Sequence, residues 1–118
     1  MTRGAGAPEK YPTIYRQSDG AAVGRLTPAG TLEIPLATRW IRLGWTTPDG
    51  FVFSELEPGP APCGWVVNGV GYRAGSPDEP VVLVTPSGVI RKADGEVTGT
   101  VDPPDRLAGA ALFLALSQ

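Results

Sequence analysis

The sequence predicts an all-β, mainly antiparallel domain: a small barrel or sandwich of about eight or nine short strands in a meander, with one short apolar C-terminal helix. Three observations favour this class. Apolar or alternating runs recur about every 8 to 12 residues with turn residues between them, a spacing typical of sandwiches and barrels. The 16 glycines and 13 prolines are spread between these runs. The one long apolar run, residues 107–116, is rich in Ala and Leu, which favours a helix over a strand.

Short runs with the pattern expected of strands precede this helix. In residues 38–46, Leu43 and Trp45 occupy alternate positions, so we expect both to face the core. Trp40 and Arg42 lie at the intervening positions and are expected to face outward. The runs are residues 11–17, 21–27, 31–36, 38–46, 51–57, 65–73, 80–85, 88–92 and 96–101.

Turn residues punctuate the runs at regular places. Thr-Pro-x-Gly elements at 27–30, 47–50 and 85–88 predict tight hairpin turns, because Pro presets φ and Gly accepts the left-handed conformation that follows. Asp19-Gly20 indicates another hairpin. The patterns DGxxxGxLxP at 19–28 and DGxxxGxVxP at 94–103 leave two interpretations open, an internal hairpin repeat or turn residues that recur in any β-rich chain.

We expect the helix over about residues 103–116. Asp102 can serve as its N-cap, Pro103 fits the first turn, and Asp105 suits the positive end of the helix dipole. Apolar side chains occur on every face, so the helix is expected to plug the sheet structure, to lend one face to a partner chain, or to contact a membrane surface. Ten apolar residues make about 15 Å of helix, half of the ~30 Å hydrocarbon core, so no membrane span is expected.

Length and composition define the broad class. The 118 residues predict a single β-rich domain over 11–118, preceded by a flexible arm at 1–10 that lacks the apolar core of a signal peptide. A net charge of −2 without a basic stripe argues against nucleic-acid binding. The lone Cys63 permits no internal disulfide, which is typical of a reducing compartment, so we expect a cytoplasmic protein.

The residues that carry most enzyme chemistry are missing. The chain has no histidine, which excludes Ser-His-Asp and Cys-His catalysis and His-based metal sites within one chain. Cys63 has no activating neighbour in the sequence and is interpreted as a small apolar filler. Glu55 and Glu57 would share one strand face at about 6 to 7 Å, a separation that carboxylate hydrolases use. The favoured interpretation is a solvated edge strand, and a carboxylate-dependent hydrolase is the distant alternative. We expect no cofactor, no metal and no enzymatic activity.

Aromatic residues supply the candidate binding sites. An outward Trp40 flanked by Arg39 and Arg42 is a combination that interfaces favour. Trp45, Trp65 and Tyr72 predict instead a pocket, because a barrel of about eight strands can hold one small ligand unless a helix fills it. We therefore expect a protein-interaction or structural module with a protein partner or a second copy. The alternative is a barrel that binds a small molecule in an aromatic pocket.

Overall fold

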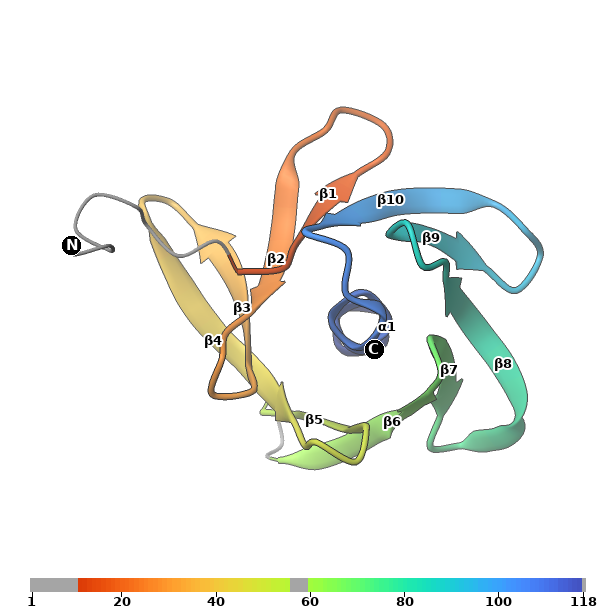
Figure 1. Cartoon of the computed structure of the whole chain (residues 1–118). Helices are drawn as coiled ribbons and strands as arrows, with labels where there is room; N and C mark the ends of the chain where they lie inside the picture. Colours follow the sequence, from red (N-terminus) through yellow and green to blue (C-terminus); the bar gives the residue numbers. More distant parts are fainter. Residues whose placement is uncertain (1–10, 56–59, 118) are drawn as a thin grey trace, which may run out of the picture.

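The computed structural model describes residues 11–55 and 60–117. It is a closed antiparallel barrel in which each strand pairs with its neighbours in sequence and the first strand pairs with the last. Figure 1, viewed along the helix, shows the strands as a ring around it. The all-β antiparallel class and the C-terminal helix are therefore confirmed, and the barrel is favoured over the sandwich. The expected arm at 1–10 lies outside the described residues.

The barrel has ten strands instead of the expected eight or nine. They are β1 (Thr13–Arg16), β2 (Ala22–Leu26), β3 (Thr31–Leu36), β4 (Arg39–Thr46), β5 (Phe51–Ser54), β6 (Ala61–Val67), β7 (Val70–Arg73), β8 (Ser76–Val84), β9 (Val89–Lys92) and β10 (Val97–Asp102), followed by the helix α1 (Arg106–Leu116).

The additional strand comes from residues 65–73, which were expected to form one strand. Asn68 and Gly69 adopt positive φ angles of 50° and 83°. Two consecutive positive φ values make the two-residue hairpin turn for which Asn-Gly is the preferred sequence. The chain therefore reverses here, and β6 and β7 pair through Val67 and Val70.

The Thr-Pro-x-Gly elements form the predicted hairpin turns. In each, the Gly N–H donates to the Thr carbonyl at 2.9 Å, as in Gly30 to Thr27 and Gly88 to Thr85. The Thr hydroxyl oxygen also accepts from a backbone N–H at the start of the next strand, for example from Thr31 to Thr27 at 3.1 Å. Each turn is therefore closed by its own threonine.

These turns are linked to one another around one end of the barrel. The carbonyl of each turn glycine accepts a 2.8 Å hydrogen bond from the next hairpin; the donor–acceptor pairs are Thr46–Gly30, Val66–Gly50, Val84–Gly69 and Val101–Gly88. Leu26 donates to Pro12 in the corresponding place at 3.0 Å. The barrel is thus a ring of five similar strand pairs, β2–β3, β4–β5, β6–β7, β8–β9 and β10–β1.

The helix α1 fills the interior. It contacts β1, β2, β4, β5, β6, β7, β8 and β10. Near its first turn it presents Ala108, Gly109, Ala110 and Ala111, all buried, and a Cβ on Gly109 would approach Val84 to 3.0 Å. Farther along, Leu112 and Leu114 are fully buried. Aliphatic side chains from the strands and the thiol of Cys63 complete this core; the aliphatic residues are Ile14, Leu26, Leu32, Leu43, Val52, Val66, Val82, Val84, Ile90 and Val101.

The helix begins later than expected. Asp102, predicted to be the N-cap, belongs to β10 and pairs with Thr13. Asp105 is the N-cap instead, and its carboxylate accepts from the N–H of Ala108 at 2.9 Å. The physical reason is Pro104, because a residue that precedes proline is disfavoured in the helical region, so Pro103 cannot belong to the first turn.

The buried helix predicts a large loss of stability for one leucine substitution. Leu112→Ala should lower the free energy of unfolding by about 2–5 kcal/mol, because it leaves a cavity at a fully buried position. Leu116→Ala is the matched control in the same helix; since this side chain is 41% exposed, its loss should cost under about 1 kcal/mol. Urea denaturation measures both, and equal costs would contradict a plug packed around Leu112.

Candidate functional site

The aromatic residues of the strands lie on the outer wall of the barrel. β-Bulges decide this placement. In β4 the register shifts at Leu43, so Leu43 and the following Gly44 are both buried, and Trp45 returns to the outside. Strict alternation had predicted Trp45 inside, which is wrong because the bulge inserts one residue into the strand.

Two of the five strand pairs carry stacked aromatic pairs at equivalent outer positions. Trp45 stacks on its cross-strand partner Phe53 with ring centroids 5.1 Å apart, and Trp65 stacks on Tyr72 at 6.1 Å. Phe51 pairs with Trp65 across β5 and β6 and is 48% exposed. We call these five residues the aromatic face. Since aromatic cross-strand pairs contribute roughly 0.2–1 kcal/mol, they also stabilise the sheet.

A sheltered arginine lies beside the aromatic face. The Arg25 guanidinium carbon is 4.1 Å from the centroid of Trp40 and 5.1 Å from that of Tyr11. The Arg25 Nε also donates to Glu33 at 2.7 Å. The outer side chain of Trp40 is therefore half-buried under Arg25 within its own chain.

The expected binding residues lie at different places on the barrel. Arg39 and Arg42 are exposed on β4. Arg42 lies over Trp45 at 5.6 Å, so it borders the aromatic face. Trp65 and Tyr72 are brought together, but they lie on the outer wall while α1 occupies the interior. The interior is lined by the buried core residues of the strands and by α1, and Trp45, Trp65 and Tyr72 do not belong to that core. Binding of a small molecule in a pocket of these three residues stays a prediction.

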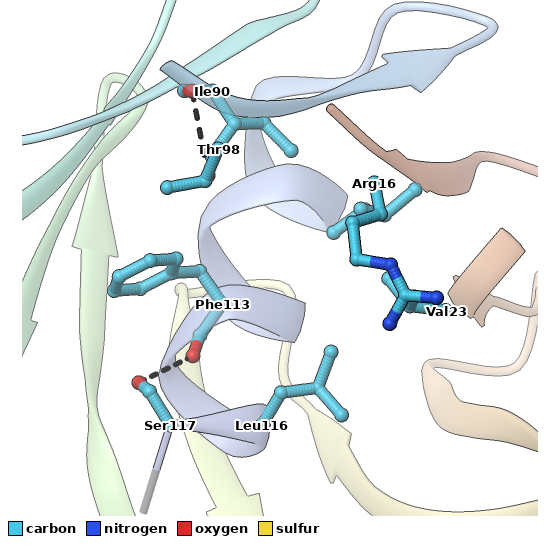
Figure 2. A pocket seen from close by; sticks show the side chains of 8 residues that line it. Arg16, Val23, Ile90, Thr98, Phe113, Leu116 and Ser117 are labelled. Atoms are coloured by element: carbon cyan, nitrogen blue, oxygen red, sulfur yellow. Dashed lines mark hydrogen bonds between the residues drawn. The ribbon is translucent and has the colours of Figure 1, made fainter. Parts of the chain in front are cut away.

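A pocket of about 280 Å³ opens at the end of the barrel where α1 finishes. Figure 2 shows its side chains gathered around the last turns of the helix, with Leu116 directed toward Arg16 and Val23. The walls are mainly apolar, and the lining residues are Ile14, Arg16, Val23, Ile90, Thr98, Phe113, Leu116 and Ser117. We call it the C-terminal pocket. No local sequence pattern predicts this pocket, because its residues come from strands and a helix far apart in the sequence.

Cations surround this end of the barrel. Arg16, Arg73 and Lys92 are each the last residue of an odd-numbered strand, β1, β7 and β9. Arg73 donates to the Ser117 hydroxyl at 2.7 Å. The C-terminal end of a helix carries partial negative charge, so Arg73 beside Ser117 favours the seated helix. Arg16 and Lys92 are paired with Asp19 and Glu96 at 2.8 and 2.9 Å.

Arg16 is held at the mouth of the pocket by Asp19. The guanidinium donates twice to the carboxylate, at 3.0 and 2.8 Å. This hydrogen bond is the main cause that lowers the pKa of Asp19 to about 2, and a second bond from the Ala21 N–H acts in the same direction. Two of the five guanidinium N–H groups are used in this pair, which leaves donors for another acceptor.

The structure places two of the three residues considered for catalysis, Glu55 and Cys63, and it brings neither into a catalytic group with the other. Glu55 pairs with Arg42 at 2.7 Å, and Glu57 lies outside the described residues. Cys63 is a buried core residue, and burial raises the pKa of its thiol. Within residues 11–55 and 60–117, no group of three His, Cys, Asp or Glu residues could hold a metal ion. In the same part of the chain, no helix is long and apolar enough to cross a membrane.

Comparisons with protein-family models, with curated proteins and with solved structures find no match to this chain. The aromatic face and the C-terminal pocket are the two candidate binding surfaces of this chain.

The Arg16–Asp19 pair predicts an unusual titration. Asp19 should stay ionised down to about pH 2, and Arg16→Gln should return its pKa toward the ordinary 3.8. Because the folded pKa is depressed, the stabilising contribution is complete above about pH 3.8 and is lost as the pH falls through about 2. Carboxyl ¹³C shifts followed by NMR measure this. An Asp19 midpoint near 3.8 in the unchanged protein would contradict the paired geometry.

Burial of Cys63 predicts an unreactive thiol. Its side chain is 3% exposed and its raised pKa lowers the thiolate fraction, so reaction with Ellman's reagent at pH 8 should be slower than in denaturant by about tenfold or more. Absorbance at the thionitrobenzoate band follows the reaction. Equal rates in the folded and unfolded protein would show that this part of the wall is open.

Proposed function

We propose that this chain is a non-enzymatic protein-interaction or structural module that docks through its aromatic face, with a second copy of the chain as the first partner to test. The observation that carries the proposal is the division of apolar residues between the two sides of the wall. Aliphatic side chains and α1 make the core, while the aromatic rings of the strands are on the outside.

The composition of this face supports a protein partner. Trp, Tyr and Phe, together with Arg, are enriched in protein interfaces, and binding energy concentrates on a few large aromatic anchors. Phe51 is the most exposed ring of the aromatic face, at 48%. Val67, on the neighbouring strand β6, is 51% exposed. Stacking holds the neighbouring rings in place, so little side-chain entropy is lost on binding.

The remaining features agree with this proposal. Arg42 borders the aromatic face and supplies a polar rim, as interfaces commonly have. The closed barrel leaves no free strand edge in the wall, so association would use side chains instead of strand addition. We place the protein in the cytoplasm, because a single buried thiol suits a reducing compartment.

Substitution of Phe51 tests the proposal. Phe51→Lys should weaken self-association about tenfold or more, because loss of a central aromatic anchor costs roughly 2 kcal/mol or more. Leu83→Lys is the matched control, since Leu83 is also an outward strand residue, 43% exposed, on a neighbouring strand pair. Sedimentation velocity over a concentration series gives the association constants.

Two results would defeat the proposal in turn. Equal weakening by Phe51→Lys and Leu83→Lys would show that the aromatic face has no special part in association. If the unchanged chain is a monomer at all concentrations, a copurified partner must be lost with Phe51→Lys and kept with Leu83→Lys. A partner retained by both variants, or no partner at all, overturns the assignment of this face.

A further inference from the structure

One of the five strand pairs is built differently at the end of the barrel where α1 finishes. In four of them, one strand carries a β-bulge, and the backbone carbonyl of the bulged residue accepts a hydrogen bond. The donor is the backbone N–H of the residue that directly follows the partner strand. The donor–acceptor pairs are Glu55–Leu43, Ala74–Cys63, Ala93–Val81 and Gln17–Thr98, at 2.9 to 3.2 Å. In the β2–β3 pair the position that matches Glu55 is Pro35, which has no N–H.

The wall is hollowed where this bond is missing. The β2–β3 ladder consists of Arg25–Glu33 and Leu26–Leu32, which leaves Val23 and Pro35 apart from it. A hollow of about 290 Å³ lies there, with Val23, Ile34 and Pro35 among its walls. It adjoins the C-terminal pocket, because Arg16, Val23 and Leu116 line both. The hollow beside Pro35 therefore continues the C-terminal pocket along β2 and β3.

The lining combines an apolar body with a cationic rim. Five of the eight residues of the C-terminal pocket are aliphatic or aromatic. Arg16 stands at its mouth with N–H groups beyond the two that bind Asp19. Arg73 reaches the same end through Ser117. Ligand pockets of proteins usually measure ~300–1,000 Å³ and combine apolar walls with a few polar groups. At about 280 Å³ the C-terminal pocket lies just below this range, which limits it to a small ligand.

We propose that the C-terminal pocket binds a small aliphatic carboxylic acid, with its hydrocarbon chain against Val23, Ile90 and Phe113 and its carboxylate against Arg16. The carboxylate of the ligand accepts from the Arg16 N–H groups that Asp19 leaves unused, and the planar guanidinium matches the planar carboxylate. The site lies apart from the aromatic face, so either proposal can fail without the other.

Titration with octanoate, followed by ¹H–¹⁵N NMR on the full chain, tests this site. Saturable shifts should gather at the amides of Val23, Thr98, Phe113 and Ser117. Arg16→Gln should weaken octanoate about tenfold or more, as expected for loss of a charged hydrogen bond, and should leave octan-1-ol unchanged. Arg91→Gln, on the outer face of β9, is the matched control and should change neither. Acetate alone should give no saturable shift.

A filled pocket should exclude both ligands. Val23→Phe places a ring in the space that the hydrocarbon chain would take, and Leu83→Phe on the outer wall controls for added apolar area. If Val23→Phe does not fold, Thr98→Leu fills the same pocket from β10. The proposal is overturned if octanoate gives no saturable shift at millimolar concentration, if its shifts gather on the aromatic face, or if the pocket and control variants behave alike.

Discussion

Burial of α1 inside the ring of strands is the constraint on which the other features depend. A ten-stranded barrel encloses more space than its own aliphatic side chains fill, and the helix supplies the missing volume. Small residues at its first turns let Val84 and Val101 come close to Gly109, and Leu112 and Leu114 fill the space farther along. With the interior occupied, binding is left to the outer wall and to the two ends of the barrel.

Much of the architecture could be predicted from local signals. Turn spacing gave the all-β class, Pro and Gly gave the Thr-Pro-x-Gly hairpins, and composition gave the C-terminal helix. The errors arose where one local signal outweighed another. Asn68-Gly69 was a strong turn signal inside an apolar run. The consecutive prolines moved the N-cap from Asp102 to Asp105.

The binding surfaces were harder to predict, because bulges change which side a residue faces. Trp40 and Arg42 lie outside, where alternation put them, whereas the bulge at Leu43 reversed the side of Trp45. The sequence does contain a signal for the bulges, since a glycine follows the bulged residue in four strands. These glycines are at positions 24, 44, 64 and 99. The C-terminal pocket had no such local signal. It depends on Arg16, Ile90 and Phe113 meeting in space. The hollow beside it depends on Pro35, whose effect is visible once the equivalent strand pairs are compared.

Closure of the ring by β1 and β10 has a consequence for the order of folding. Residues 13–16 pair with residues 99–102, and the helix that fills the interior follows directly. On the ribosome, β1 must therefore wait until most of the domain has been synthesised before its second partner exists. Contacts so distant in sequence carry a high loop-closure entropy and slow the rate-limiting step. The nascent sheet has an open edge and an unfilled interior during that interval, which is when aggregation and chaperone binding compete with folding.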